Sequence, residues 1–257
     1  MRPALPAGFL TSPIAHRGYH DAASRRPENS VSAFQAAVEA GYGIELDVQL
    51  TRDGQAMVFH DDTLDRMTGR PGAVRDYTAA ELGQIRLLDS DDLIPTLAQV
   101  LGLVAGRTPL LIELKDLLDT MAPTSGRLEQ ASVTALSGYE GPAALMSFNP
   151  HCIATVNRLA PQIPRGLTTE YYDHGLSAPI PPAICDRLRE IPDYDPTGCT
   201  FISHRHTDLD QPRVAALKAQ GAAILCWTIK SPQDEAKARK IAHNITFEGY
   251  PAPFIRP

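Results

Sequence analysis

Ionisable side chains that could act together in catalysis stand in pairs at the ends of short apolar segments. The pairs are His16 with Arg17, Glu45 with Asp47, and Glu113 with Lys115. In the last two pairs the spacing is two residues, which places both side chains on one face of a β-strand. A polar face at the end of an apolar strand is unfavourable unless a partner satisfies it. Each pair alone would also fit a solvent-exposed strand end, so the prediction depends on whether the pairs meet.

A turn brings a further residue, His60, towards the same place. Asp-Gly at residues 53–54 lies between two segments of alternating polarity, which is a strong signal for a two-residue hairpin loop. With this loop, Arg52 pairs with Gln55, and continuing the ladder places Asp47 opposite His60. Cross-strand neighbours contact one another, so we expect this carboxylate and this imidazole to lie within reach. A β-bulge in the hairpin would break the predicted register.

Three carboxylates and two histidines can thus converge, and their chemistry suits a phosphate ester. The carboxylate oxygens of Glu45, Asp47 and Glu113 favour one hard divalent cation, Mg²⁺ or Ca²⁺, which keeps waters that a phosphate can displace. The histidines, His16 and His60, would supply one base and one acid near neutral pH. A zinc hydrolase with both histidines as ligands is an alternative at this point.

Charge and composition restrict the partners of the chain. Arg17 and Lys115 would neutralise the phosphoryl oxygens of a small-molecule substrate. The formal net charge of −6 argues against a nucleic-acid partner. No apolar run reaches the roughly 18 residues of a membrane span, so no integral membrane segment is expected. The four cysteines form no C-x-x-C pair, which favours free thiols in a reducing cytoplasm, and a homodimer is a base-rate expectation.

The elements that must position these residues alternate between short apolar strands and helices. Strands are expected near residues 14–15, 44–50, 56–60, 110–115, 144–148, 165–169, 200–204, 223–229 and 244–249. Helices are predicted from Ser30 to Ala40 and after the caps Thr96 and Ser231. Repeated alternation favours a parallel sheet, and eight core strands favour an α/β fold closed into a (β/α)8 TIM barrel. In such a barrel the site lies at the C-terminal ends of the strands.

The length of the chain fits this architecture without a second large domain. A (β/α)8 barrel typically needs about 250 residues, and the chain has 257. We therefore expect residues 1–257 to form one catalytic domain, with a hairpin-containing insertion over roughly 51–93, after the second core strand. The irregular, proline-rich stretch at 171–198 is the expected lid or rim loop.

Several short motifs occur in order along the chain. They are Ala15-His16-Arg17-Gly18, Pro27-Glu28-Asn29-Ser30, Glu45-Leu46-Asp47, Thr51-Arg52-Asp53-Gly54, Val58-Phe59-His60-Asp61, Leu64-Asp65-Arg66, Ile94-Pro95-Thr96-Leu97 and Glu113-Leu114-Lys115. Weaker echoes follow at Ser147-Phe148 and Trp227-Thr228. In combination these motifs are highly specific, and the chain resembles the glycerophosphodiester phosphodiesterase family.

The resemblance implies a (β/α)8 barrel and a hydrolase that converts glycerophosphodiesters to sn-glycerol 3-phosphate and an alcohol, a reaction of lipid and glycerol metabolism. It implies that Glu45, Asp47 and Glu113 bind the divalent cation. It also implies that His16 and His60 are the acid and the base. The positions that would hold phosphate, metal or glycerol are Arg17, Glu28, Asn29 and Lys115, and Trp227 would be an aromatic wall of the pocket.

This sequence departs from the family pattern in three places. Ser30 replaces the usual threonine after Pro-Glu-Asn, and Met67 replaces the threonine expected after Asp-Arg. The last strand commonly ends Asp-Gly-Ile-Ile-Thr-Asp, whereas residues 243–249 read His-Asn-Ile-Thr-Phe-Glu-Gly, which changes the rim near Glu248. The alternative functions are a lysophospholipase D or sphingomyelinase D-like lipid phosphodiesterase, and a non-catalytic barrel that binds glycerol phosphates.

Overall fold

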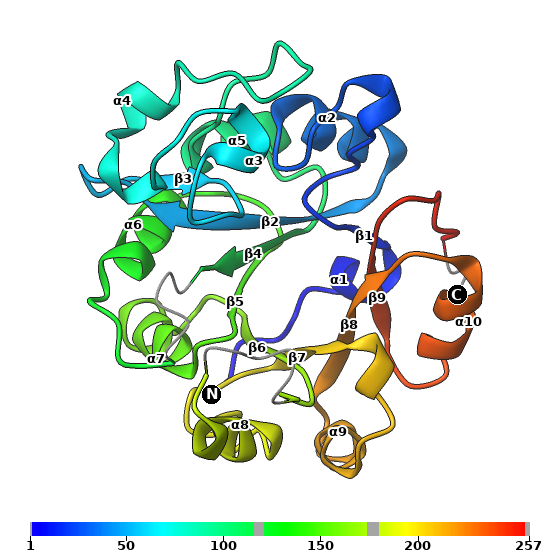
Figure 1. The fold of residues 1–257 in the computed structure, drawn as a ribbon. Coiled ribbons are helices and arrows are strands. Elements are labelled where there is room, and N and C mark those ends of the chain that lie inside the picture. The colour runs from blue at the N-terminus through cyan, green and yellow to red at the C-terminus, as the bar shows by residue number, and fades with distance from the viewer. Residues whose placement is uncertain (1, 116–120, 174–179, 255–257) are drawn as a thin grey trace.

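The computed structural model describes residues 2–115, 121–173 and 180–254. Within these ranges eight parallel strands form a closed barrel with helices packed around it (Figure 1). In barrel order the strands are β1 (Ile14–Ala15), β2 (Gly43–Leu50), β4 (Leu110–Leu114), β5 (Ala143–Ser147), β6 (Arg165–Thr169), β7 (Phe201–Arg205), β8 (Ala223–Ile229) and β9 (Asn244–Phe247). The short strand β1 closes the barrel, because Ala15 pairs with Ile44 of β2 and with Phe247 of β9. The predicted TIM barrel is confirmed.

The helices begin where capping residues place them. The longer ones are α2 (Val31–Ala40), α5 (Leu97–Val104), α6 (Arg127–Ala135), α7 (Pro150–Leu159), α8 (Pro182–Arg189), α9 (Pro212–Ala219) and α10 (Pro232–Ala238). The side chains of Ser30, Thr96 and Ser231 each accept a hydrogen bond from a backbone N–H of the first turn, as predicted for α2, α5 and α10. None of the helices in the described ranges is both long and apolar enough to cross a membrane.

The insertion after β2 packs a small apolar cluster of its own. It contains β3 (Ala56–Val58), α3 (Asp65–Thr68), the 3₁₀ turn η2 (Val74–Asp76) and α4 (Ala79–Leu82). The buried side chains of this cluster are Met57, Phe59, Leu64, Val74, Leu82, Ile85, Leu87 and Ile94. Because this cluster anchors the segment, the residues that follow β3 hold a defined place beside the barrel mouth.

The β2–β3 hairpin differs from the prediction at its loop. The backbone N–H of Gly54 donates to the carbonyl of Thr51 at 3.0 Å, and the N–H of Thr51 donates to the carbonyl of Gln55 at 3.0 Å. Gly54 has φ +81°, in the left-handed region. The loop therefore spans three residues, 52–54, as in hairpins that combine a type I turn with a left-handed glycine and a bulge.

The longer loop shifts the pairing by one residue. Val48 pairs with Val58, and the N–H of Phe59 donates to the carbonyl of Asp47 at 3.1 Å. Asp47 thus lies opposite Phe59, and the predicted pairing of Asp47 with His60 is wrong. His60 nevertheless lines the cavity at the barrel mouth, because the chain leaves the ladder after Val58.

Below the mouth, towards the N-terminal ends of the strands, the barrel interior is filled by apolar side chains. They are Phe9, Ile14, Leu111, Ala144, Met146, Phe201 and Leu225. Phe9 comes from α1 (Gly8–Thr11), which lies before β1. A Cβ atom at Gly166 would lie 2.4 Å from the ring of Phe201, so this close approach requires glycine. This packed floor leaves only the C-terminal ends of the strands for a polar site.

Candidate active site

Three buried carboxylates form the centre of the site. On β2, Leu46 packs outwards into the core cluster, while the alternating residues Glu45 and Asp47 line the interior cavity. Asp47 pairs in parallel register with Glu113 of β4. Each of the three residues is at most 7% exposed, and one carboxylate oxygen from each lies within 4.8 Å of the others. The predicted convergence of the three carboxylates is confirmed.

The charges of two cationic side chains, Lys115 and Arg17, partly compensate those of the carboxylates. The Nζ atom of Lys115 lies 2.8 Å from Glu113 and 3.3 Å from Asp47. Burial raises the pKa of Glu45 well above its usual value, and repulsion from Asp47 and Glu113 adds to the effect. Burial would also raise the pKa of Asp47, but the nearby charges of Lys115, His60 and Arg17 together outweigh it and hold this pKa well below its usual value. The cluster thus contains carboxylates with opposite tendencies to hold a proton.

Two further residues bind the carboxylates: Arg17, which follows β1, and Asn29, which precedes α2. The backbone N–H of Arg17 donates to Glu45 at 2.9 Å, and its Nε lies 3.5 Å from Asp47. Asn29 donates from Nδ2 to Asp47 at 2.9 Å. Both Arg17 and Asn29 have φ near +54°, and the N–H of Asn29 donates to the carbonyl of Arg17 at 2.8 Å. Glu28 lies outside the cavity and accepts a hydrogen bond from Nη1 of Arg17 at 2.7 Å.

His60 is held by its neighbour in sequence. Its Nδ1 atom lies 2.7 Å from Oδ1 of Asp61, and a carboxylate oxygen accepts, so Nδ1 carries the proton. Burial lowers the pKa of His60, and the charge of Lys115 lowers it further. The neutral ring therefore keeps Nε2 as the unprotonated nitrogen available to the cavity.

His16 is held in the same way by a residue from the other end of the chain. Its Nδ1 lies 2.5 Å from Oε2 of Glu248, and its Nε2 lies 3.9 Å from Oε2 of Glu45. His20 and Lys230 also contact Glu248, at 3.6 Å and 2.7 Å. The hydrogen bond from His16, together with the nearby His20 and Lys230, holds the pKa of Glu248 far below its usual value. Glu248 thus stays ionised and fixes the orientation of the His16 ring.

These side chains line one cavity of about 120 Å³ at the barrel mouth. The lining residues are His16, Arg17, Glu45, Asp47, His60, Glu113, Lys115, Met146, Phe148, Thr168, Trp227, Thr228 and Thr246. Trp227 packs edge-to-face against Phe148 with ring centres 5.5 Å apart, and its indole N–H donates to the carbonyl of Ser203. The hydroxyls of Thr168 and Thr246 are buried and have no hydrogen-bond partner among the described residues. The cavity thus has a charged side, an aromatic wall and free hydroxyls.

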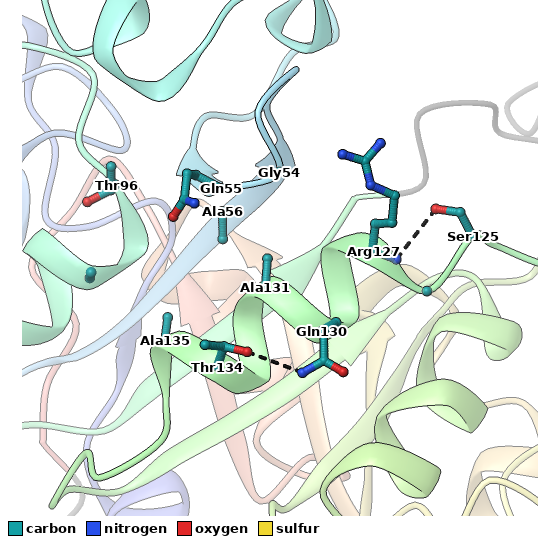
Figure 2. Close-up of a pocket in the computed structure, with 12 residues that line it drawn as sticks. Gly54, Gln55, Ala56, Thr96, Ser125, Arg127, Gln130, Ala131, Thr134 and Ala135 are labelled. Atoms are coloured by element: carbon teal, nitrogen blue, oxygen red, sulfur yellow. Dashed lines mark hydrogen bonds between the residues drawn. The ribbon is translucent and has the colours of Figure 1, made fainter.

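A larger hollow, of about 500 Å³, lies away from the barrel mouth. Figure 2 shows it between the hairpin tip, α5 and α6, where Ala131 and Ala135 face Gln55 and Ala56. Its described lining contains no carboxylate, imidazole or thiol, and Arg127 is the ionisable residue there. The hollow therefore lacks groups for acid–base or metal chemistry, and the smaller cavity is the candidate site.

The predicted site residues line the cavity, with the exception of Glu28 and Asn29. These two lie outside the cavity and bind residues that line it: Glu28 binds Arg17, and Asn29 binds Asp47. His204 of β7 does not line the cavity; it is buried and hydrogen-bonded to Thr169 at 2.8 Å. The expected rim loop at 171–198 lies partly outside the described residues, and within its described part Pro182–Arg189 form helix α8, so the prediction of an irregular loop is wrong there. Sequence reasoning missed several residues: Asp61 and Glu248 as partners of the histidines, and Thr168 and Thr246 in the cavity.

Comparison with known proteins identifies the family. The glycerophosphoryl diester phosphodiesterase family matches residues 16–244. The chain belongs to this family. The glycerophosphodiester phosphodiesterase of Caldanaerobacter subterraneus subsp. tengcongensis is 37% identical over 234 residues, which cover 86% of each chain. A glycerophosphodiester phosphodiesterase of Bacillus subtilis is 26% identical and covers 98% of this chain and 89% of its own length.

Solved structures of the family agree with the fold. A phosphodiesterase of Oleispira antarctica, in complex with the product sn-glycerol-3-phosphate, has a TM-score of 0.77 and 26% identity, and the match covers 95% of this chain and 94% of that one. The glycerophosphodiester phosphodiesterase of Thermotoga maritima has a TM-score of 0.68 at 22% identity, covering 92% and 94%, which supports the fold. The resemblance seen in the sequence is thus confirmed, as is the enzyme class, a phosphoric diester hydrolase.

Proposed function

We propose that this member of the family hydrolyses glycerophosphodiesters to sn-glycerol 3-phosphate and an alcohol. The observation that carries the proposal is the meeting of three buried carboxylates with two oriented histidines in one cavity. Support comes from the Oleispira phosphodiesterase, which holds sn-glycerol-3-phosphate as its product. The barrel and its insertion would act together as one catalytic domain, since both supply residues to the cavity.

The carboxylates Glu45, Asp47 and Glu113 fit a divalent cation. They offer oxygen ligands only, which suits Mg²⁺ or Ca²⁺ and disfavours the zinc alternative with histidine ligands. Because all three are buried, their mutual repulsion is poorly screened by water, and a cation would relieve it. The cation would supply positive charge for a phosphoryl oxygen and a glycerol hydroxyl.

His16 and His60 would move the protons. Each presents Nδ1 to a carboxylate and keeps Nε2 for the cavity. One would take a proton from the nucleophile, either water or the 2-hydroxyl of the substrate, and the other would protonate the leaving alkoxide. The lowered pKa of His60 favours the neutral imidazole that a base requires.

The remaining site residues would bind and orient the substrate. Arg17 and Lys115 would attract the phosphoryl oxygens, since both line the cavity beside the carboxylates. Trp227 would pack against the substrate with its aromatic face. Glu28 and Asn29 would hold Arg17 and Asp47 in place, which makes them positioning residues.

We also propose a cytoplasmic location for the enzyme. The thiols of Cys185, Cys199 and Cys226 are free and buried. Unpaired thiols persist most readily in a reducing compartment, which supports this location. Fractionation of cells that produce the chain at native levels tests it, and recovery of the enzyme outside the cytoplasm would contradict the proposal.

A hydrolysis screen tests the function directly. Glycerophosphocholine, glycerophosphoethanolamine, glycerophosphoglycerol and lysophosphatidylcholine are incubated with the enzyme and Mg²⁺ or Ca²⁺, with and without a chelator. We expect sn-glycerol 3-phosphate from the first three, and loss of turnover on exhaustive chelation. Activity that survives chelation would refute the metal assignment. Faster turnover of lysophosphatidylcholine would move the assignment to lipid substrates, and binding without turnover would indicate a non-catalytic barrel.

Substitutions separate the two histidines from the rest of the protein. His16→Ala and His60→Ala should each reduce turnover by about 10²-fold or more. His151→Ala is the matched control, because His151 is exposed on α7 and does not line the cavity. Near-normal turnover in either site variant would remove that residue from the chemical step.

A further inference from the structure

Arg66 of α3 lies between two carboxylates that each support a different part of the site. Its guanidinium donates to Glu28 through Nη2 at 2.6 Å and Nη1 at 3.1 Å. It also donates to Asp61 through Nε at 2.6 Å and Nη2 at 2.9 Å. Both contacts are two-pronged, which is the geometry in which an arginine binds a carboxylate most specifically.

The two carboxylates lead to two different residues of the cavity. Asp61 binds Nδ1 of His60 at 2.7 Å, and Glu28 binds Nη1 of Arg17 at 2.7 Å. A continuous path of charge-assisted hydrogen bonds therefore runs from Arg17 through Arg66 to His60. Arg66 itself does not line the cavity.

We propose that Arg66 is a positioning residue of the insertion, which holds the proton-transfer group His60 and the phosphate-binding group Arg17 in one fixed arrangement. The proposal rests on the roles given to His60 and Arg17 in the proposed function. Arg66 acts through Asp61 and Glu28 and touches no reacting atom. The insertion thereby contributes to catalysis from outside the barrel.

The bonding pattern explains why an arginine is needed. Oδ1 of Asp61 accepts from both His60 and Arg66, so the carboxylate must stay ionised and aligned for both donors. Arg66 and His60 together outweigh the effect of burial and lower the pKa of Asp61 to about 2. A lysine could reach one carboxylate as a point charge but could not grip both with a planar fork. Without the guanidinium, Asp61 can rotate, and the His60 ring loses its fixed tautomer.

The position of Arg66 separates this role from a purely structural one. Its side chain is 48% exposed, and it comes from a four-residue helix at the surface of the insertion. Its partners Glu28 and Asp61 are less exposed, at 15% and 23%, but without the guanidinium Glu28 still binds Arg17 and Asp61 still binds His60. Loss of Arg66 thus leaves both carboxylates with a partner, and water screens the exposed guanidinium itself. Removal of Arg66 should therefore change the site while the fold remains intact.

Kinetics of Arg66→Ala test the proposal. We expect kcat to fall at least tenfold through His60 and KM to rise several-fold through Arg17, with little change in thermal unfolding. Asp61→Asn should lower mainly kcat, and Glu28→Gln should raise mainly KM. Arg86→Ala is the matched control, because Arg86 pairs with Asp91 in an exposed contact on the same insertion. Added guanidinium at tens of millimolar should partly restore Arg66→Ala and leave the control unchanged.

A spectroscopic measurement gives an answer that does not depend on turnover. In protein with ¹⁵N-labelled histidine at pH 7.5, His60 should show a protonated Nδ1 and an unprotonated Nε2, assigned by loss of the signals in His60→Gln. Arg66→Ala should mix the two tautomers, as should Asp61→Asn. The double variant Arg66→Ala/Asp61→Asn should lose no more of its kcat than the more damaged single variant, because both substitutions act on the His60 ring. The positioning role is wrong if the His60 tautomer is unchanged in Arg66→Ala. It is also wrong if the fold-loss of kcat in the double variant equals the product of the two single losses. Inactive wild-type protein with a normal tautomer pattern would instead refute the proposed function.

Discussion

Replacement of Lys115 by methionine should tighten the binding of a divalent cation to the carboxylate cluster. The ammonium of Lys115 lies 2.8 Å from Glu113 and 3.3 Å from Asp47, so it already neutralises two of the three carboxylates that would hold the cation. Its side chain is only 20% exposed, so water screens it little. Methionine keeps the length and apolar stem of the side chain but removes the charge, so the carboxylates attract a cation more strongly.

The expected size of the effect follows from the charge that is removed. An opposite charge within about 4–6 Å shifts the pKa of a carboxyl by about 1–3 units, and one unit corresponds to about 1.4 kcal/mol. We take the lower end, because the variant relaxes, and expect a Kd for Ca²⁺ or Mg²⁺ at least about tenfold lower. At saturating cation the added stabilisation of about 1.4 kcal/mol corresponds to a rise of about 3–6 °C in the cation-induced Tm shift.

Isothermal titration calorimetry of metal-free protein measures Kd, and thermal unfolding with and without cation measures the Tm shift. Both are made at pH 8, because loss of Lys115 raises the pKa of Asp47 and lets protons compete with the cation. Lys237→Met is the control, since Lys237 pairs with Asp234 at the surface of α10. Unchanged or weaker cation binding in a folded Lys115→Met protein, with the control equal to wild type, would refute the reasoning.

Three further substitutions test other parts of the structure. Glu248→Gln should lower kcat about tenfold or more with little change in KM, because Nδ1 of His16 loses its anionic partner at 2.5 Å. Steady-state kinetics measure this effect, with Asp234→Asn at the surface as the control. Gly166→Ala should destabilise the barrel by about 1–3 kcal/mol in urea unfolding, since the new Cβ would lie 2.4 Å from the Phe201 ring. A second substitution, Phe201→Leu, should relieve part of this loss. If the losses of unfolding free energy in the two single variants add up in the double variant, the clash is not the cause. Burial lowers the pKa of His204 to about 4, so the stability that its neutral form contributes is present above pH 6.5 and is lost as the pH falls towards 4. Between pH 7 and pH 5 wild type should lose about 2 kcal/mol more than His204→Gln, and equal losses in the two proteins would show that His204 does not titrate as buried.

The strands and their inward carboxylates could be predicted because the signals are local. The alternation in residues 44–50 places Glu45 and Asp47 on one face, and the parallel register then brings Glu113 beside Asp47. Both facts follow from short-range periodicity and from the rule that neighbouring parallel strands end at the same edge. The hairpin register could not be predicted with the same success, because Asp-Gly serves two-residue and three-residue loops alike. The left-handed Gly54 with its bulge decided between them.

The partners of the histidines could not be predicted because they depend on long-range packing. Glu248 is separated from His16 by 232 positions, and only closure of the barrel by β1 and β9 brings them together. Arg66 is near His60 in sequence, yet its role depends on the insertion folding over Glu28. Asp61 follows His60 directly and is the partner for which a local signal existed, a histidine followed by a carboxylate.

The charges in the cavity explain how an acidic protein can receive an anionic diester. The lining carries three carboxylates, from Glu45, Asp47 and Glu113, against the two cations Arg17 and Lys115. With these five groups ionised and the histidines left out of the sum, one negative charge remains, which would repel a phosphate. Burial raises the pKa of Glu45, so a proton there can neutralise the site. A divalent cation would displace that proton and change the balance to one positive charge. Cation affinity should therefore rise with pH, and attraction of the phosphate should follow occupation of the carboxylate cluster.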